Sequence, residues 1–437
     1  MKPALAWASG RSPADSALSA WDGLRYGALG APLAFAALPL YVLLPSHYGG
    51  RLGVPLAALG AVLLGTRALD ALVDPWLGRL ADRVLARQRR QALALAAVAA
   101  LLMAAGFAAL FFPPVEGAGP LLWWCGASLV LTCLGYSTLG VLHQAWGARL
   151  GGGAATQARI VSWREGLSLV GVLAASVLPA LAGVGTMVAL CAGLLLLAWW
   201  ALVHAPYRVA SPRLAAAPAV LAPGHSDAWM AWRQPAFRRL MAVFLLNGVA
   251  SAVPATLVLF FIRDRLQAPA WEPVLLGAYF AAAALSMPLW VRAVARWGLL
   301  RSWLAGMGLA VAAFAWAAGL GPGDTAAFLM ICLASGAALG ADLAVPGALL
   351  AGVIRRAGHA LHHEGHYFGW WTCINKLNLA LAAGLALPLL QGLGYAPGAR
   401  DAGALAALGL IYASLPCLLK LAAAALLWHH RHALDLP

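Results

Sequence analysis

The chain has 437 residues, of which 63% are apolar and 10% are charged, whereas roughly 25% of residues are charged in an ordinary soluble domain. This composition excludes a large soluble domain. It predicts an all-α polytopic membrane protein, because helices satisfy their own backbone hydrogen bonds in lipid. The formal net charge of +14 raises nucleic-acid binding as an alternative, which the distribution of the charges must decide.

Apolar runs of about 20 residues recur along the chain and predict twelve transmembrane helices. The longest internal hydrophilic stretch divides them into an N-terminal six-helix bundle (1–205), a central loop (206–238) and a C-terminal six-helix bundle (239–437). A weak internal repeat supports this division, since PWLGRLADR from Pro75 and PLWVRAVAR from Pro288 space proline and arginine alike. The spans are expected near residues 35, 64, 102, 132, 172, 194, 250, 282, 309, 338, 379 and 415.

Arginines concentrate in alternate loops, whereas the other loops are close to neutral. By the positive-inside rule, we expect the arginine-rich loops and both termini in the cytoplasm of an inner-membrane protein. Membrane topology thus explains the excess of basic residues, so we expect no binding of nucleic acid. The expected partners are the lipid bilayer and a small-molecule substrate, and we expect the protein to be a monomer. The two richest loops contain Arg79, Arg83, Arg87, Arg89 and Arg90, and Arg208, Arg213, Arg233, Arg238 and Arg239.

Three charges interrupt the second predicted span, in the stretch GTRALDALVDPWLGRLADR. At about 100° per residue, Arg67, Asp70 and Asp74 lie on one helical face. Asp70 is roughly 13 Å inside the cytoplasmic end, where a carboxylate costs about 2.5 to 3.5 kcal/mol and requires a cavity or a partner. Two carboxylates one turn apart suit Na⁺ or a shared proton. Alternatively, Arg67 neutralises one aspartate and the stripe only holds helices together.

Lys376 lies about ten residues into its span, too deep for an easy exit to the headgroups. A cation at that depth requires a carboxylate, and three deep acids are available. A mobile cation could therefore switch the pairing between conformations, with a purely structural salt bridge as the alternative. The deep charges are Arg67, Arg164 and Lys376 against Asp70, Asp74 and Asp342.

Weaker polar signals lie elsewhere. Tyr136 and His143 give the fourth span a polar face that either binds a substrate or joins helices. Most tryptophans, Trp371 among them, are typical of membrane interfaces. Asp82 lies at the membrane edge among arginines, which favours a role in closing a cytoplasmic gate. We expect a solvated loop face for His359, His362, His363 and His366.

Two stretches in the first half resemble a known superfamily of transporters. GRLADRVLARQRR resembles the cytoplasmic loop after the second helix of the major facilitator superfamily, with Gly78, Asp82 and Arg83 in the expected order. DALVDPWLG, with Asp70 and Asp74, is similar to the second helix of its glycoside-pentoside-hexuronide:cation symporters, the group typified by melibiose permease.

Three further stretches carry the same resemblance. GADLAVPGALLAGVI and EGHYFGWWTCINKLNLALAAG resemble the tenth and eleventh helices of that family, and Lys376 falls on its intramembrane lysine. Arg164 in SWREGL matches its fifth-helix arginine. The resemblance covers nearly the whole chain and implies the major facilitator fold, in which two bundles rock about a central site.

The resemblance implies a secondary active transporter of a sugar or sugar-like solute, coupled to Na⁺ or H⁺, with no enzymatic chemistry, resident metal or other cofactor. Asp70 and Asp74 would bind the coupling cation. The residues expected to bind the substrate or gate its path are Arg67, Tyr136, His143, Arg164, Asp342, Trp371 and Lys376. Those expected to form the cytoplasmic gate are Gly78, Asp82 and Arg83.

The chain departs from the family pattern in two places. Sugar-binding members carry aspartates on the first and fourth helices, and the corresponding spans here contain no acid. Either other groups bind the sugar, or a more apolar or anionic solute meets Arg164 and Lys376. The missing fourth-helix acid also makes proton coupling comparatively more plausible than Na⁺ coupling. The alternatives are a lipid, drug or organic-anion carrier of the superfamily, or a non-transporting sensor or scaffold.

Overall fold

The computed structural model describes residues 19–44, 47–207, 229–395 and 398–434. Every regular element within these ranges is a helix. The first half contains α1 (Ala20–Gly27), α2 (Gly30–Leu38), η2 (Pro39–Leu43), η3 (His47–Arg51), α4 (Leu56–Arg87), α5 (Arg89–Phe111), α6 (Ala118–Arg149) and α7 (Ala154–Val203). The second contains α9 (Met230–Arg233), α10 (Pro235–Phe260), η4 (Phe261–Arg265), η5 (Pro269–Trp271), α11 (Glu272–Ala315), η6 (Trp316–Gly319), α12 (Thr325–Arg356), α13 (Glu364–Gly392), α14 (Ala402–His429) and α15 (Arg431–Leu434).

Eight helices in the described ranges are long and apolar enough to cross a membrane, so the prediction of an all-α polytopic membrane protein is confirmed. The count of twelve spans stays a prediction. Two continuous helical runs, α7 and α11, each join two helices at a glycine. Gly183 and Gly298 have φ of 78° and 79°, in the left-handed region where glycine pays no steric cost.

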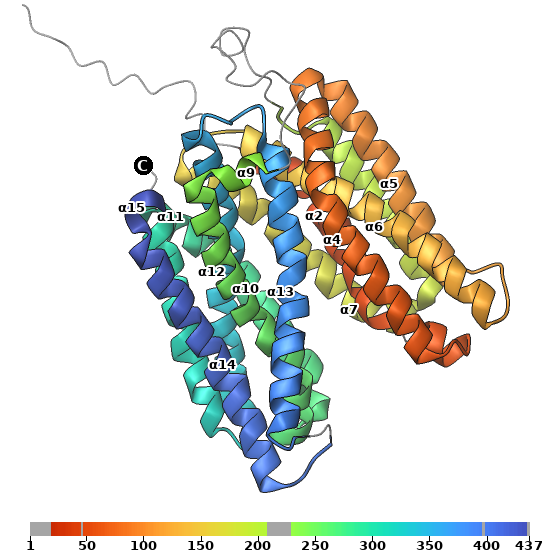
Figure 1. Cartoon of the computed structure of the whole chain (residues 1–437), viewed down its shortest axis with the longest axis vertical. Coiled ribbons are helices and arrows are strands. Elements are labelled where there is room, and N and C mark those ends of the chain that lie inside the picture. The colour runs from red at the N-terminus through yellow and green to blue at the C-terminus, as the bar shows by residue number, and fades with distance from the viewer. Residues whose placement is uncertain (1–18, 45–46, 208–228, 396–397, 435–437) are drawn as a thin grey trace, which may run out of the picture.

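The helices form two bundles, one from each half of the chain (Figure 1). Most buried apolar side chains of the first half, from Tyr26 to Ala205, form one core. The second half contains two large clusters, one from Met230 to Leu434, which also includes Ala158 of α7, and one from Val249 to Ala413. Each bundle thus packs around its own interior. Most of the central loop predicted between them, residues 208–228, lies outside the described residues.

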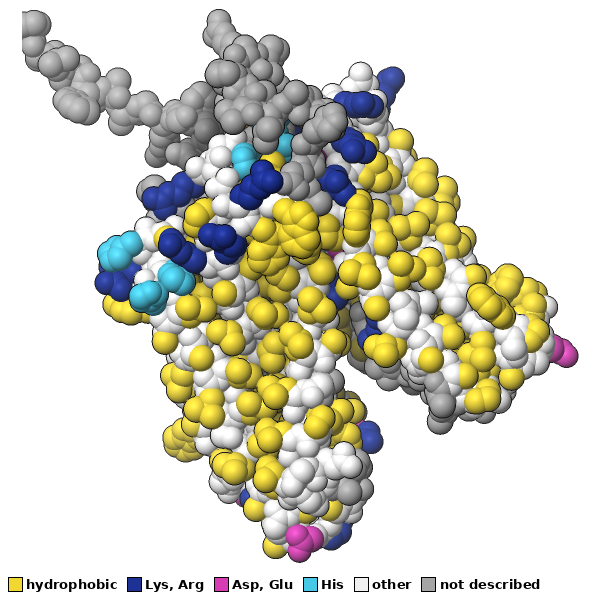
Figure 2. All heavy atoms as spheres, in the orientation of Figure 1, with side chains coloured by type: hydrophobic (Ala, Val, Ile, Leu, Met, Phe, Trp, Pro, Cys, Tyr) yellow, Lys and Arg dark blue, Asp and Glu magenta, His cyan; other side chains and the backbone are white. Residues whose placement is uncertain are grey.

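The two bundles meet at one end of the molecule and diverge toward the other (Figure 1). Figure 2 shows arginine side chains gathered around the joined end, and a wedge-shaped cleft between the bundles at the opposite end. We call these the arginine-rich end and the open end. Two seams join the bundles: α4 packs on α13, and α7 packs on α11 and α12.

Glycines allow the backbones of α4 and α13 to approach closely. A Cβ on Gly369 would lie 2.6 Å from the carbonyl oxygen of Asp74, closer than real Cβ contacts allow. Gly78 and Gly365 are in equally tight contact with each other's backbone. The close crossing places the α13 residues that follow Gly369 directly over the acidic face of α4.

Candidate functional site

The acidic stripe of α4 faces Lys376 of α13 across the seam between the bundles. The Lys376 Nζ atom lies 2.7 Å from Oδ2 of Asp70 and 2.9 Å from Oδ2 of Asp74. Lys376 also donates a hydrogen bond of 2.8 Å to the Ser137 hydroxyl of α6. Because Lys376 follows Gly369 by two helical turns, it lies on the same face of α13 as the close crossing.

The two carboxylates of this cluster differ in their hydrogen bonding. Asp70 accepts a 2.6 Å hydrogen bond from Ser137. Asp74 is 0% exposed, and its Oδ1 accepts a 3.0 Å hydrogen bond from Lys376. The Asp74 Oδ2 atom is close to the ammonium but accepts no hydrogen bond with good geometry from the described residues.

Two carboxylates and one ammonium are in direct contact in this cluster. Asp70 and Lys376 are the charged neighbours of Asp74. Arg67, one turn before Asp70, is partly buried, and its charge acts on Cys133 of α6. The oxygens of two neighbouring carboxylates suit a monovalent cation or a shared proton.

A second group of contacts closes the arginine-rich end. Asp82 of α4 is 7% exposed and accepts hydrogen bonds of 2.7 and 2.8 Å from the backbone N–H groups of Gly365 and His366. These groups belong to the first turn of α13, where the helix dipole favours a negative charge. Asp82 and Gly78 thus join the bundles where the gate was predicted. Arg83 is exposed and makes no hydrogen bond or ion pair among the described residues.

An ion pair that was not predicted joins the same end. Arg149, at the end of α6, lies 3.2 Å from Glu364 at the start of α13, and both side chains are buried. Arg149 also donates to the carbonyl oxygen of Leu361. An arginine ending the fourth span and a glutamate beginning the eleventh are complementary charges on one side of the membrane. The two charges were visible in the sequence, but their pairing was not.

Of the histidines beside this ion pair, His366 is buried, His359 and His363 are partly buried, and His362 is exposed. His366 is 1% exposed, which corrects the expectation for that residue. Burial lowers the pKa of His359 and His362, and repulsion from His362 and Arg149 respectively adds to the effect. Burial, with repulsion from its neighbours, lowers the pKa of His363 to about 4. The three loop histidines are therefore neutral near pH 7.

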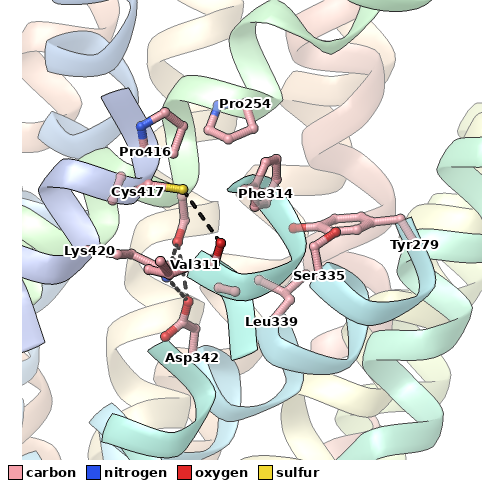
Figure 3. Close-up of a pocket in the computed structure, with 13 residues that line it drawn as sticks. Pro254, Tyr279, Val311, Phe314, Ser335, Leu339, Asp342, Pro416, Cys417 and Lys420 are labelled. Carbon is pink, nitrogen blue, oxygen red and sulfur yellow. Dashed lines mark hydrogen bonds and ion pairs between the residues drawn. The ribbon is translucent and has the colours of Figure 1, made fainter. Parts of the chain in front are cut away.

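Asp342 does not belong to the cluster at the α4–α13 seam, so its predicted availability to Lys376 is wrong. It lies within the C-terminal bundle, where its Oδ2 is 2.6 Å from Nζ of Lys420 on α14 (Figure 3). A small cavity lined by Tyr279, Phe314 and Cys417 adjoins the pair (Figure 3). Lys420 was visible in the sequence as one of three lysines, but its partner was not.

The hydrogen bonds of this second pair are complete. Asp342 accepts four, from Asn247, Trp303, Ser251 and Lys420, at 3.0, 2.9, 3.2 and 2.6 Å. Lys420 donates three, to Asp342, Asn247 and Ser251. A carboxylate and an ammonium with every site occupied offer nothing to a ligand. This arrangement favours a structural role for Asp342 over the predicted gating role.

Arg164 has a partner that the sequence analysis overlooked. Its Nε and Nη2 atoms donate hydrogen bonds of 2.9 and 2.6 Å to one oxygen of Glu165. Neighbouring residues on a helix point in directions about 100° apart, so the arginine side chain bends around α7 to make this pair. The deep charges at the seams therefore include Glu165, whereas Asp342 is paired elsewhere.

The other predicted substrate contacts lie in packed surroundings. His143 is 1% exposed, and its Nε2 atom is 2.7 Å from the Tyr26 carbonyl oxygen, which favours the helix-joining interpretation. Tyr136 packs against the core of the N-terminal bundle. Trp371 stacks on Phe244, with ring centroids 3.5 Å apart. Among the described residues, neither Trp371 nor His143 makes a hydrogen bond to the cluster of Asp70, Asp74 and Lys376.

Comparison with known protein families identifies the family of this chain. The family model described as MFS/sugar transport protein matches residues 24–431, nearly the whole chain. The chain belongs to this family. Its members are transporters of the major facilitator superfamily, so this is a multi-pass membrane transporter. Comparison with curated protein sequences gives no match.

Solved transporter structures share the fold of this MFS protein at low sequence identity. A bacterial homologue of the iron transporter ferroportin in an outward-facing state has 14% identity and a TM-score of 0.65, covering 93% of this chain and 98% of that chain. The human organic anion transporter MFSD10 has 16% identity and a TM-score of 0.66, with coverage of 93% and 98%. The E. coli fucose:proton symporter has 13% identity and a TM-score of 0.61, with coverage of 92% and 97%.

Proposed function

We propose that this transporter moves a sugar or sugar-like solute by alternating access, driven by a gradient of Na⁺ or H⁺. The family's description as sugar transport proteins supports the solute class. The observation that carries the coupling is the cluster of Asp70, Asp74 and Lys376, because its acids and its ammonium belong to different bundles.

The position of the cluster gives a physical route from cation binding to conformational change. Opening the arginine-rich end requires α13 to leave α4, which takes Lys376 away from both aspartates. Two neighbouring carboxylates in a low-dielectric site that lose the ammonium between them are costly. A bound Na⁺ or proton supplies positive charge in place of the Lys376 ammonium, so the loaded protein opens that end at lower cost. A cation that favours one conformation in this way transfers the energy of its gradient to the solute.

The direction of transport follows from the predicted topology. If the arginine-rich end is cytoplasmic in an inner membrane, the cleft in Figure 2 opens to the outside. The contacts of Asp82 and Arg149 then hold the inward path shut while the solute and the cation enter. The same contacts must break during each cycle, so they contribute to the balance between the two states.

The test is uptake of labelled monosaccharides by vesicles that contain only this protein, with an imposed Na⁺ or pH gradient. We expect accumulation above the external concentration with one of the two gradients, and its loss in Asp74→Asn. Glu116→Gln, which removes an exposed acid in the connection between α5 and α6, is the matched control. Gradient-independent movement of lipids or organic anions alone would favour the carrier alternatives. No flux of any solute would favour a sensor or scaffold.

A further inference from the structure

The second seam between the bundles also carries charge, and the proposed coupling mechanism does not use it. Val161, Glu165 and Leu169 are spaced four residues apart on one face of α7. Val161 lies against Gly347 of α12, where an added Cβ would be 3.4 Å away. Leu169 packs with Met287 of α11 in a small apolar cluster. Glu165 therefore faces the C-terminal bundle, between two contacts that cross the seam.

The depth and exposure of Glu165 suit a site that a solute reaches. Glu165 follows the start of α7 at Ala154 by eleven residues, which is about 16 Å along the helix. Its side chain is 22% exposed, and that of Arg164 is 12% exposed. The guanidinium lies beside Gly347, with Nη2 4.0 Å from the place where a Cβ on that glycine would lie. Asp74, by contrast, is fully buried.

The Arg164–Glu165 pair has unused hydrogen-bonding capacity on both sides. Both hydrogen bonds from Arg164 go to Oε1 of Glu165, so Oε2 accepts none from the described residues. A guanidinium has five N–H donors. Two of these donate to Glu165, and a third can donate to the Tyr26 hydroxyl, which interacts with Arg164. Two N–H donors of the guanidinium are then left. The pair thus presents a charged acceptor and charged donors side by side.

We propose that Arg164 and Glu165 form the hydroxyl-recognition site for a neutral polyhydroxyl solute, with Glu165 supplying the carboxylate that the first and fourth spans lack. This rests on the proposed sugar transport. Each sugar hydroxyl both donates and accepts, so it can bond to Oε2 of Glu165 and to the guanidinium together. A neutral solute leaves the ion pair balanced, whereas an anionic solute must compete with Glu165 for Arg164.

The test compares solutes that differ in one group. Thermal unfolding of the purified protein is followed with galactose and galacturonate, and with glucose and glucuronate, because a bound solute stabilises the folded state according to its concentration and Kd. We expect the neutral sugar of at least one pair to stabilise the wild type more than its uronate. Glu165→Gln should weaken binding of that neutral sugar about tenfold or more, the loss of one charge-assisted hydrogen bond. It should also strengthen uronate binding, since Arg164 loses its counter-ion.

Two variants keep the result interpretable. Glu165→Asp retains the charge but shortens the reach, and we expect it to keep the preference for neutral sugars with a smaller loss of affinity. Glu116→Gln should behave as the wild type. Unchanged sugar binding in Glu165→Gln overturns the inference while leaving the proposed transport intact. Stabilisation of the wild type by uronates alone, or by no sugar, overturns both this inference and the sugar part of the proposed function.

Discussion

The ammonium of Lys376 lies 2.9 Å from a carboxylate oxygen of Asp74, and these two residues belong to different bundles. The pair can exist only while α4 and α13 are in contact, as they are at the closed, arginine-rich end. Its state is therefore tied to the conformation of the whole protein. By contrast, the pair of Asp342 and Lys420 lies within one bundle and can persist while the bundles rock.

Lys376 occupies the position that a coupling cation would take between the two aspartates. Replacing it with methionine leaves two neighbouring carboxylates, so we expect the protein to bind a proton or Na⁺ about tenfold more tightly, or more. The measurement is the thermal stabilisation of purified protein by Na⁺ at several pH values. Lys420→Met, which removes the other deep lysine, is the matched control. If both variants respond alike to pH and Na⁺, Lys376 has no special relation to the cation.

The pair of Asp342 and Lys420 should contribute to stability rather than to coupling. Removing one partner leaves a buried charge unpaired, at a cost of about 3 to 5 kcal/mol. We expect Asp342→Leu or Lys420→Met alone to lower the melting temperature, and the double variant to recover most of the loss. Gradient-driven uptake by the double variant should be close to normal. A well-folded double variant that has lost coupling would return Asp342 to the transport pathway.

Asp82 should set the balance between the two conformations. Its carboxylate accepts two backbone hydrogen bonds at the N-terminus of α13, so Asp82→Asn should weaken closure by about 1 to 2 kcal/mol, a factor of about 5 to 30. Spin labels at the exposed positions Arg83 and Arg301, one in each bundle, would report the separation of the arginine-rich ends. An unchanged distance distribution in Asp82→Asn would contradict this role.

Acid should destabilise the closed end through the loop histidines. The pKa of His363 in the folded protein is about 4, below the ordinary value of 6.5. Below pH 6.5 the unfolded chain binds a proton that the folded chain does not, so stability falls as the pH decreases from about 6.5 toward 4. Above pH 6.5 the residue is neutral in both states and has no such effect. We expect the melting temperature of His363→Gln to decline less than that of the wild type between pH 7.5 and pH 5. An equal decline of the melting temperature in the two proteins would be evidence against this role of His363.

The sequence predicted those parts of the site for which helical spacing and the cost of burying charge lead to the same conclusion. The acidic face of α4 followed from the spacing of Asp70 and Asp74 and from the cost of charge in lipid. The partner of Lys376 could not be chosen among three deep acids, because that choice depends on how closely α4 and α13 approach. Gly78 of α4 and Gly365 and Gly369 of α13 allow this approach, but their role is visible only once the helices are known to cross.

Other parts of the site depended on tertiary contacts that no local pattern encodes. Glu165 was hidden beside Arg164, since neighbouring residues on a helix normally point apart and only a bent arginine side chain joins them. The sequence could not distinguish a His143 that binds a solute from one that hydrogen-bonds to the backbone of Tyr26. The closing pair of Arg149 and Glu364 joins residues far apart in the chain, at positions that ordinary loop charges also occupy.

The central claim is that Asp70 and Asp74 bind the cation that drives accumulation, and one paired measurement tests it most directly. In vesicles containing wild type, Asp70→Asn or Asp74→Asn, both gradient-driven accumulation and gradient-free exchange of the same sugar are recorded. The asparagine variants are nearly isosteric, so they test charge more than packing. We predict that each variant loses accumulation while exchange survives, since exchange needs only the solute pathway. Full accumulation by the triple variant Asp70→Asn, Asp74→Asn, Lys376→Gln would contradict the account, because a neutral cluster would then couple as well as a charged one.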